Sequence, residues 1–455
     1  MRNLTPWPMP LWAAGEQTAS APDASTSGQS GRMENVAPVG LGQSAQQPDW
    51  LVAATCTDNI AAPPVGGTEG NAVCGIFPFA QNTNSLVGAG VAFSYNAAND
   101  KIYLHHLSET GTILRTALAY GAGTGGAYTL TTPPQITGFE WYGKFIYCEY
   151  AREAASTRLG LGIYDPVAGT CSVSTYDIVT GGAAAAALRF RGIAKHGGGG
   201  IALGWGYQDE ESAANIDSPS FLRWCKYGAV DLSVVGAWQE DTTEIRAGGA
   251  IIGTLGLPIV GVAGSGVASV IGKEREVFGF YGTYGSQFYT EPIGHHGPVS
   301  TTGITSFGPG AAWMAEVGVC VSMNGQSMQI LTTNRERKRL QTYFDLSYCW
   351  AAHDAPRNRV GFLLRRSQNI SGTALTASWG DEILWWDYER DTFSTSGLPT
   401  TCFSFGTIKG TGLTLAAPAG PPVIAAASSV GATSATLNWT NGDTSLDVTT
   451  FLEYK

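Results

Sequence analysis

Short runs of alternating apolar and polar residues fill the chain from about residue 51 to residue 402. Glycine, asparagine, aspartate and proline separate these runs. Because side chains two positions apart share one face of a strand, this pattern predicts successive antiparallel β-strands joined by tight turns. Helical segments are scarce. Residues 183–190 predict about two helical turns, and residues 334–344, preceded by the potential capping residue Thr333, predict one short helix.

Two predicted hairpins share the same turn pattern. Asn96 precedes Lys101 by five positions across one turn, and Asp354 precedes Arg359 by five positions across another. We therefore expect the same hairpin to be used twice. Further hairpins are predicted over 139–151, over 200–207 with 221–227, over 250–262 with 277–284, and over 312–323 closing at Asn324-Gly325.

A second repeated pattern is an apolar residue, an aromatic residue and an aspartate at the end of a strand. It occurs at 163–165 and at 385–387, and in both copies a Thr follows the aspartate by five positions and a Ser by seven. An aspartate in this position starts a turn by accepting backbone N–H groups. Two copies about 220 residues apart indicate a repeated unit, and the hairpins divide the region into about six units of about 55–60 residues. We therefore predict a β-propeller of about six blades.

Composition agrees with this all-β prediction. The chain has 455 residues, more than the roughly 250–300 that one compact core usually holds unless the architecture is repetitive. It contains 60 glycines, and only 14% of its residues are charged, against about 25% in ordinary domains. We expect the propeller over residues 51–410.

The segments outside the propeller have a different composition. Residues 1–50 are rich in Ser, Gln, Ala, Gly and Pro, which predicts either a disordered tail or an extended arm that becomes ordered on a partner. In the second case Trp7 and Trp12 are the expected anchors. Residues 411–420 read as a Pro/Ala/Gly linker.

Residues 421–455 resemble the opening half of a fibronectin type III module, an Ig-like β-sandwich. The resemblance rests on the Pro421-Pro422 entry, on a strand whose Leu437 and Trp439 would face the core, and on a third strand at 451–454. The segment covers about 35 residues, whereas a complete sandwich needs about 100. Either the module continues beyond this sequence or its strands complete a neighbour's sheet.

Eight cysteines are scattered without any CxxC pair, which argues against a zinc site. Cys56 and Cys74 are the one pair that could close a loop as a disulfide. The cysteines in alternating apolar runs are expected to be small buried hydrophobes; these are Cys148, Cys171, Cys320, Cys349 and Cys402.

No run of 18 apolar residues exists, so we expect no membrane-spanning segment. Three prolines interrupt the first 15 residues, which makes them a poor signal-peptide core. We expect the chain to be made and kept in a cytoplasm before any assembly.

No nucleophile, phosphate-loop or metalloprotease motif occurs. The pairs His105-His106 and His295-His296 are adjacent in sequence, and adjacent strand residues point to opposite faces, so we expect turn histidines rather than metal ligands. Nothing singles out a catalytic pair among the carboxylates Glu140, Asp209, Glu210, Glu211, Asp381 and Glu382. We therefore predict a protein that is not an enzyme and has no cofactor or metal.

The densest basic cluster is formed by Arg335, Arg337, Lys338 and Arg339. It is either a contact with DNA or an acidic neighbour, or a solvated turn or helix face. The net charge of −10, from 26 basic and 36 acidic residues, argues against a broad phosphate-binding surface.

The stretch 294–325, with its runs HGPVS, FGPGA, EVGV and NG, and the later WDYE at 386–389 is similar to virion proteins of tailed bacteriophages. That group includes the propeller-built tail nozzle and DNA-stabilisation proteins of short-tailed phages. The resemblance implies a homo-oligomeric ring of about six copies, a hexamer, below the portal and adaptor. Such a ring forms a conduit and gate for DNA ejection and also contacts tail fibres. The implied location is the virion tail, assembled in the host cytoplasm.

Two other functions stay open at this point. One is a secreted carbohydrate-active enzyme or lectin, because propellers with fibronectin modules also occur there. The other is a phage receptor-binding fibre protein that binds glycan through exposed aromatic residues such as Trp385 and Trp386. Because these two are adjacent on a strand, we expect one ring in the core and the other at a subunit contact.

Overall fold

The computed structural model describes most residues between 72 and 409 and short segments on either side. The described residues are 36–40, 43–46, 50–57, 72–80, 82–83, 86–96, 101–120, 134–150, 161–173, 190–209, 216–232, 234, 237–238, 258–283, 288–332, 336–367, 380–409, 414–418, 423–424, 429–431, 434–436, 439–440 and 448–454. Trp7, Trp12 and Arg335, and all but the last residue of the helix expected over 183–190, lie outside them.

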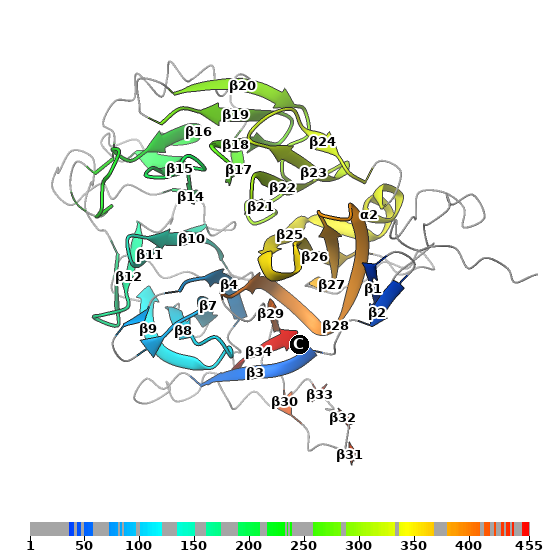
Figure 1. Ribbon diagram of the computed structural model, residues 1–455. Helices are drawn as coiled ribbons and strands as arrows, with labels where there is room; N and C mark the ends of the chain where they lie inside the picture. The colour runs from blue at the N-terminus through cyan, green and yellow to red at the C-terminus, as the bar shows by residue number, and fades with distance from the viewer. Residues whose placement is uncertain are drawn as a thin grey trace, which may run out of the picture.

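Six antiparallel sheets, which we number blade one to blade six in chain order, surround one axis (Figure 1). Blade one contains β4 (Ala72–Pro78), β7 (Gly90–Asn96), β8 (Lys101–Leu107) and β9 (Ile113–Tyr120), with a small β5 (Asn82–Thr83) and β6 (Leu86–Val87) pair in its first loop. Blade two contains β10 (Gln135–Trp141), β11 (Lys144–Tyr150), β12 (Gly162–Asp165) and β13 (Thr170–Val173). Blade three contains β14 (Gly192–Lys195), β15 (Ala202–Asp209) and β16 (Ile216–Trp224).

Blade four contains β17 (Ile259–Ser265), β18 (Ala268–Lys273), β19 (Val277–Tyr281) and β20 (Tyr289–Gly294). Blade five contains β21 (Ile304–Phe307), β22 (Gly310–Ala315), β23 (Gly318–Met323) and β24 (Gln329–Ile330). Blade six begins with β25 (Phe344–Asp354), β26 (Arg359–Arg366), β27 (Gly380–Asp387) and β28 (Thr392–Thr407).

Each blade is a meander whose consecutive strands pair with one another. Successive first strands, from β4 to β25, contact each other around the axis. In blade three a bridge between Cys225 and Trp238 takes the place of a fourth strand. The described residues therefore form an all-β propeller of six blades, and the fold class expected from the sequence is confirmed.

The aspartate-turn repeat marks equivalent positions in two blades. Oδ1 of Asp165 accepts hydrogen bonds from the backbone N–H groups two and three residues later, at 2.9 and 3.2 Å, and Asp387 does the same at 3.1 and 3.0 Å. Both turns join the third and fourth strands of their blades and end in a residue with positive φ, Gly169 at +72° and Asp391 at +50°. Blades two and six are four blades apart, so about 220 residues correspond to about 55 per blade.

The other repeated hairpin is not equivalent in its two copies. Asn96 pairs with Lys101 and Asp354 with Arg359, as predicted. However, β7 and β8 are the second and third strands of their blade, whereas β25 and β26 are the first and second. Because neighbouring strands are antiparallel, the two turns lie on opposite faces of the ring.

Two predicted hairpins have different partners. β17 pairs with β18 rather than directly with the strand at 277–281, and Gly266, at φ +61°, makes the turn between them. All six residues of β18 are buried, so it lacks the alternation that identifies a half-exposed strand. Asn324-Gly325 does not close the β22–β23 hairpin but turns the chain from β23 to β24.

Every blade is packed on both faces by its neighbours. Trp385 lies in a core cluster that joins blades six, one and two, and Trp386 lies in one that joins blades five and six. Their exposed fractions are 1% and 5%. The expectation that one ring reaches a subunit contact is therefore wrong, because a blade inside a propeller has no solvent-facing side.

The second half of β28 closes the ring by packing on β4. Ser404 Oγ donates a hydrogen bond to the carbonyl of Val73 at 2.8 Å. A Cβ on Gly406 would lie 2.3 Å from the carbonyl oxygen of Ile76, so only glycine permits this approach. The last blade is thus fastened to the first by main-chain contact.

Three strands from outside the blades extend the sheet of blade six. β29 (Thr414–Pro418) pairs with β28, β34 (Val448–Tyr454) pairs with β29, and β3 (Trp50–Thr57) pairs with β34. The linker expected over 411–420 therefore contains a strand, because its backbone groups find partners on β28. The expected arm contains the hairpin of β1 (Val36–Gly40) and β2 (Gln43–Gln46).

The segment expected to begin a fibronectin module forms two short strand pairs. β30 (Val423–Ile424) pairs with β33 (Trp439–Thr440), and β31 (Ser429–Gly431) pairs with β32 (Ser434–Thr436). The strand expected third, β34, joins the blade-six sheet instead. The fibronectin resemblance stays a prediction.

Helix α2 (Arg337–Tyr343) and the 3₁₀ turn η5 (Ala355–Arg357) flank β25. The helix expected over 334–344 is present but shorter, and its N-cap residue Glu336 makes no side-chain cap hydrogen bond. No helix among the described residues is long and apolar enough to cross a membrane.

Histidines and cysteines of blade one are core residues. Cys74 is a free, buried thiol that lies 3.7 Å from the carbonyl oxygen of Phe93, so the structure does not contain the disulfide considered between Cys56 and Cys74. His105 and His106 lie on β8, fully buried, rather than in a turn. His295 and His296 do follow the end of β20, as expected.

We predict that Phe405→Ala opens the ring closure. Phe405 is fully buried on β28 with its ring centroid 6.0 Å from that of Trp385, and truncating such a residue costs about 3–5 kcal/mol of unfolding free energy. Urea denaturation measures the loss. Leu118→Ala, at a side chain 46% exposed, is the control and should change stability by about 0.5 kcal/mol or less. Equal effects of the two substitutions would contradict the role of β28.

We also predict that stability falls on acidification between pH 6.5 and pH 4. Burial lowers the pKa of His105 to about 4, and burial together with the positive charge of Arg115 lowers the pKa of His106 to about 4. The unfolded chain therefore binds more protons in this window, and each imidazole contributes about 3 kcal/mol that is present above pH 6.5 and lost toward pH 4. Urea midpoints at several pH values should show a shallower pH dependence for the His105→Gln/His106→Gln variant. An unchanged slope would show that other groups carry the effect.

Candidate functional site

A cavity of about 540 Å³ lies on the axis and is lined by the first strands of all six blades. Each first strand pairs on one side only within its sheet, so its other edge turns toward the axis. The lining is mostly apolar and includes Phe77, Phe139, Lys195, Thr302, His353 and Thr407. It also includes Ala355 and Pro356 of η5, so the cavity opens on the face of the ring that carries the turns between first and second strands. We call this the turn face.

A second cavity, of about 650 Å³, lies toward the opposite face. Its lining holds two basic and two acidic side chains, those of Arg191, Arg275, Glu274 and Glu316. Thr301 is the one residue that lines both cavities, and it is 4% exposed. Within the described part of the chain, its hydroxyl has no hydrogen-bond partner. A mostly apolar cavity and a more polar one thus meet at Thr301.

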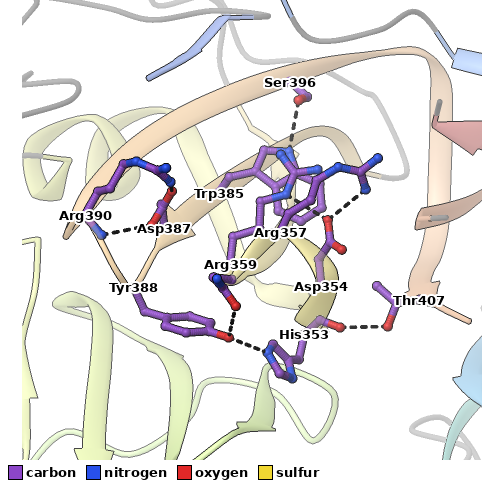
Figure 2. A network of polar contacts seen from close by, with 11 residues as sticks. His353, Asp354, Arg357, Arg359, Trp385, Asp387, Tyr388, Arg390, Ser396 and Thr407 are labelled. Carbon is purple, nitrogen blue, oxygen red and sulfur yellow. Dashed lines mark hydrogen bonds and ion pairs between the residues drawn. The ribbon is translucent and has the colours of Figure 1, made fainter. Parts of the chain in front are cut away.

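A network of polar contacts in blade six borders the first cavity (Figure 2). Asp354, fully buried, accepts hydrogen bonds from Arg359 at 2.8 Å and from Arg357 at 3.1 Å. The Arg359 guanidinium lies 3.7 Å from the ring centroid of Trp385, whose indole N–H donates to Ser396 at 2.9 Å. Arginine, carboxylate and indole therefore hold the first three strands of the blade together.

His353 and Tyr388 continue this network to the cavity wall (Figure 2). His353 Nε2 lies 3.1 Å from the Tyr388 hydroxyl, which donates to Asn358 at 3.2 Å, and Thr407 donates to the His353 carbonyl at 2.7 Å. Burial lowers the pKa of His353, and the nearby Asp354 carboxylate raises it in part; burial also raises the pKa of Tyr388. At neutral pH both side chains are uncharged and serve as structural hydrogen-bond partners.

The predicted basic cluster is divided between two roles. Arg339 on α2 forms ion pairs with Glu336, at 3.1 Å, and with Glu382, which also binds Arg366 at 2.9 Å. Both carboxylates are almost fully buried, so Arg339 anchors α2 to the sheet of blade six rather than facing a ligand. Lys338 is exposed and Arg337 half-buried on the same helix.

The carboxylates considered in the sequence form no catalytic pair where the structure describes their side chains. Glu382 is held by two arginines, and Glu140 forms an ion pair with Lys409 at 2.8 Å. Side chains of Asp209, Glu210, Glu211 and Asp381 lie outside the description. Among the described residues, no three His, Cys, Asp or Glu side chains are grouped to hold a metal ion.

Large exposed hydrophobic residues gather on the turn face. Of the nine in the described part of the chain, only Leu118 lies away from it, in the middle of β9. The other eight lie in or next to the turns on this face, in blades two to five: Tyr142, Val167, Tyr227, Val230, Val234, Val267, Tyr289 and Met323.

Tyr142 has an unusual backbone conformation among them. It forms the two-residue turn between β10 and β11 together with Gly143, and both residues have positive φ, +43° and +83°. The other positive-φ residues that are not glycine are Asn324, Asn358 and Asp391, residue types that tolerate this conformation. A tyrosine there costs about 1 kcal/mol or more, and its side chain is 57% exposed. Sequence reasoning missed this residue, although a Tyr-Gly pair between two strands was a usable signal.

No family model and no curated protein matches the chain. Among solved structures it is similar to the Neurospora crassa Pan2 WD40 domain. The sequence identity is 7% and the TM-score 0.45, over 90% of this chain and 97% of that one. The fold assignment rests on the six sheets and their order rather than on this likeness. The fold and the site define a six-bladed β-propeller protein with two cavities along its axis and exposed hydrophobic side chains on its turn face.

We predict that Arg339→Gln destabilises the protein while Lys338→Gln does not. Removing the Arg339 guanidinium takes a positive charge away from the buried carboxylates of Glu336 and Glu382. Breaking a buried ion pair in this way costs about 3–5 kcal/mol of unfolding free energy. Lys338, one residue earlier and exposed, should change the unfolding free energy by about 0.5 kcal/mol or less. Guanidinium denaturation of both variants measures the difference. Similar stabilities would mean that Arg339 is a surface residue after all.

Proposed function

We propose that this chain is a structural virion protein of a tailed phage, a nozzle or hub subunit that assembles as a ring of about six copies. The observation that carries the proposal is that the residues responsible for the phage resemblance build the propeller. A Cβ on Gly297 would lie 1.4 Å from the Lys273 carbonyl oxygen, and Ser300 donates to the carbonyl of Cys349 at 2.6 Å. The motif thus joins blade five to its two neighbours.

The side chains that could in principle take part in catalysis are arranged as expected for a scaffold protein. The ion pairs of Asp354 and Glu382 join elements of blade six, and His105, His106 and His353 make hydrogen bonds inside the fold. These groups stabilise the propeller rather than converge on a shared substrate position. We therefore assign the protein a role in assembly and not in catalysis.

The proposed conduit lies between copies and not along the axis of one propeller. A cavity of about 540 Å³ has the size of a small-molecule pocket and not of a passage for duplex DNA. With a net charge of −10, subunits around a shared lumen would repel phosphate and let DNA slide. Among the described residues of the basic cluster, Lys338 and Arg337 are left to contact DNA or an acidic neighbour.

This function predicts a ring in solution and a tail location. Native mass spectrometry of the purified full chain should give a closed oligomer of about six copies. Antibodies raised against it should label one end of phage particles in electron micrographs. A strict monomer at micromolar concentration, together with unlabelled particles, would lead us to abandon the virion role.

A further inference from the structure

The ring of Tyr142 is exposed but packs against a buried aromatic neighbour. The neighbouring Trp141 ring meets it edge-to-face, with centroids 5.2 Å apart and an interplanar angle of 88°. Trp141 is itself buried, and its indole N–H donates to the carbonyl of Ala229 in blade three at 2.9 Å. A rigid aromatic side chain loses little conformational entropy on binding a ligand.

A second exposed tyrosine lies across the boundary between blades two and three. Tyr227, 54% exposed, follows β16 and packs beside Gly200, where an added Cβ would lie 3.0 Å from its ring. The loop of Tyr227 is the same one that accepts the hydrogen bond from Trp141. Two exposed tyrosines therefore lie on adjoining turns of neighbouring blades.

Two lysines accompany these rings. Lys195 is exposed, lines the apolar axial cavity, and places its ammonium 6.0 Å from the ring centroid of Trp141. Lys226 is exposed and directly precedes Tyr227. Within the described part of the chain neither has a carboxylate partner, whereas nearby Lys144 is paired with Asp165 at 3.5 Å. Among the described residues, this sector thus has two lysines without a carboxylate partner in a protein of net charge −10.

We propose that Tyr142, Tyr227, Lys195 and Lys226 form a binding site for an acidic oligosaccharide on the rim of the turn face, beside the axial cavity that Lys195 lines. The apolar C–H face of a pyranose ring packs on a tyrosine ring, and the ammonium groups pair with sugar carboxylates. The cavity behind the rim has room for one sugar unit or more. The strained turn at Tyr142 is consistent with a residue kept for binding. This inference does not depend on the virion role.

Two other ligand classes fit less well. Single-stranded nucleic acid needs a basic track along several phosphates. Among the described residues this sector has two lysines without a carboxylate partner, because Lys144 and Lys409 pair with Asp165 and Glu140. A folded protein partner needs about 800 Å² of contact, whereas the aromatic part of this sector consists of two tyrosine side chains, Tyr142 and Tyr227.

The test uses the full chain and isothermal titration calorimetry with four probes. These are tetragalacturonic acid, neutral maltotetraose, an eight-nucleotide oligo-dT and a tetra-glutamate peptide. We expect binding of tetragalacturonic acid and at least tenfold weaker binding of the others. Tyr142→Asn should weaken binding of the acidic sugar at least tenfold while leaving the thermal midpoint unchanged or raised, because asparagine tolerates the positive φ. Lys195→Gln should weaken it at least fivefold.

Tyr289→Asn is the matched control, since Tyr289 is 54% exposed on the same face but lies in blade four. It should leave binding unchanged. The proposal is overturned if tetragalacturonic acid does not bind, if oligo-dT or the peptide binds as tightly, or if Tyr142→Asn binds like the wild type. The oligomeric state and the particle labelling test the virion role separately, so the two proposals can fail independently.

Discussion

Closure of the ring is the constraint on which the rest of this structure depends. Six twisted sheets bury both faces only if the last blade packs on the first, and here β28 completes that contact by leaving blade six and lying against β4. Without it, β4 and β25 would each expose an apolar sheet face to water. The same contact places Phe403 and Phe405 in one cluster with Phe93 and Trp385, so residues more than 300 positions apart share a core. Folding of such a chain depends on a contact between its first and last blades, which are far apart in sequence.

Turn chemistry explains how much of the fold could be predicted. The turns at Asp165 and Asp387 are determined by local sequence, since each aspartate side chain accepts hydrogen bonds from the backbone of its own turn. The prediction of six blades follows from these two copies together with the predicted hairpins, which divide the region into about six units. Strand β18 was not predicted because both of its faces are buried, which removes the alternation. The strand at 414–418 was not predicted because its Pro/Ala-rich composition is typical of a linker, although its partner β28 ends only seven residues earlier. Local sequence signals predict turns, whereas the packing of strands across the ring can be seen only in the three-dimensional structure.

Charged and aromatic residues were harder to interpret from sequence, for the same physical reason. A basic run such as 335–339 looks like a surface, yet Arg339 faces two buried carboxylates, one of them 43 residues away. Trp385 and Trp386 look like an exposed pair and are both enclosed between blades. Whether a polar or aromatic residue is available to a ligand depends on partners that sequence spacing does not reveal. Tyr142 is the converse case: its neighbours are local, and its conformation could have been anticipated from the turn alone.

The pairing of β3 with β34 has a topological consequence. Because Trp50 is opposite Tyr454 in the register, the N-terminal strand β3 and the C-terminal strand β34 lie side by side at one edge of the blade-six sheet. A short peptide bridge there would join them, and the propeller could then be opened at another loop as a circular permutant. Any domain carried before residue 50 and any domain carried after residue 454 would also emerge at the same point on the molecule's circumference. The propeller would then carry both attached domains at one position on its outer edge.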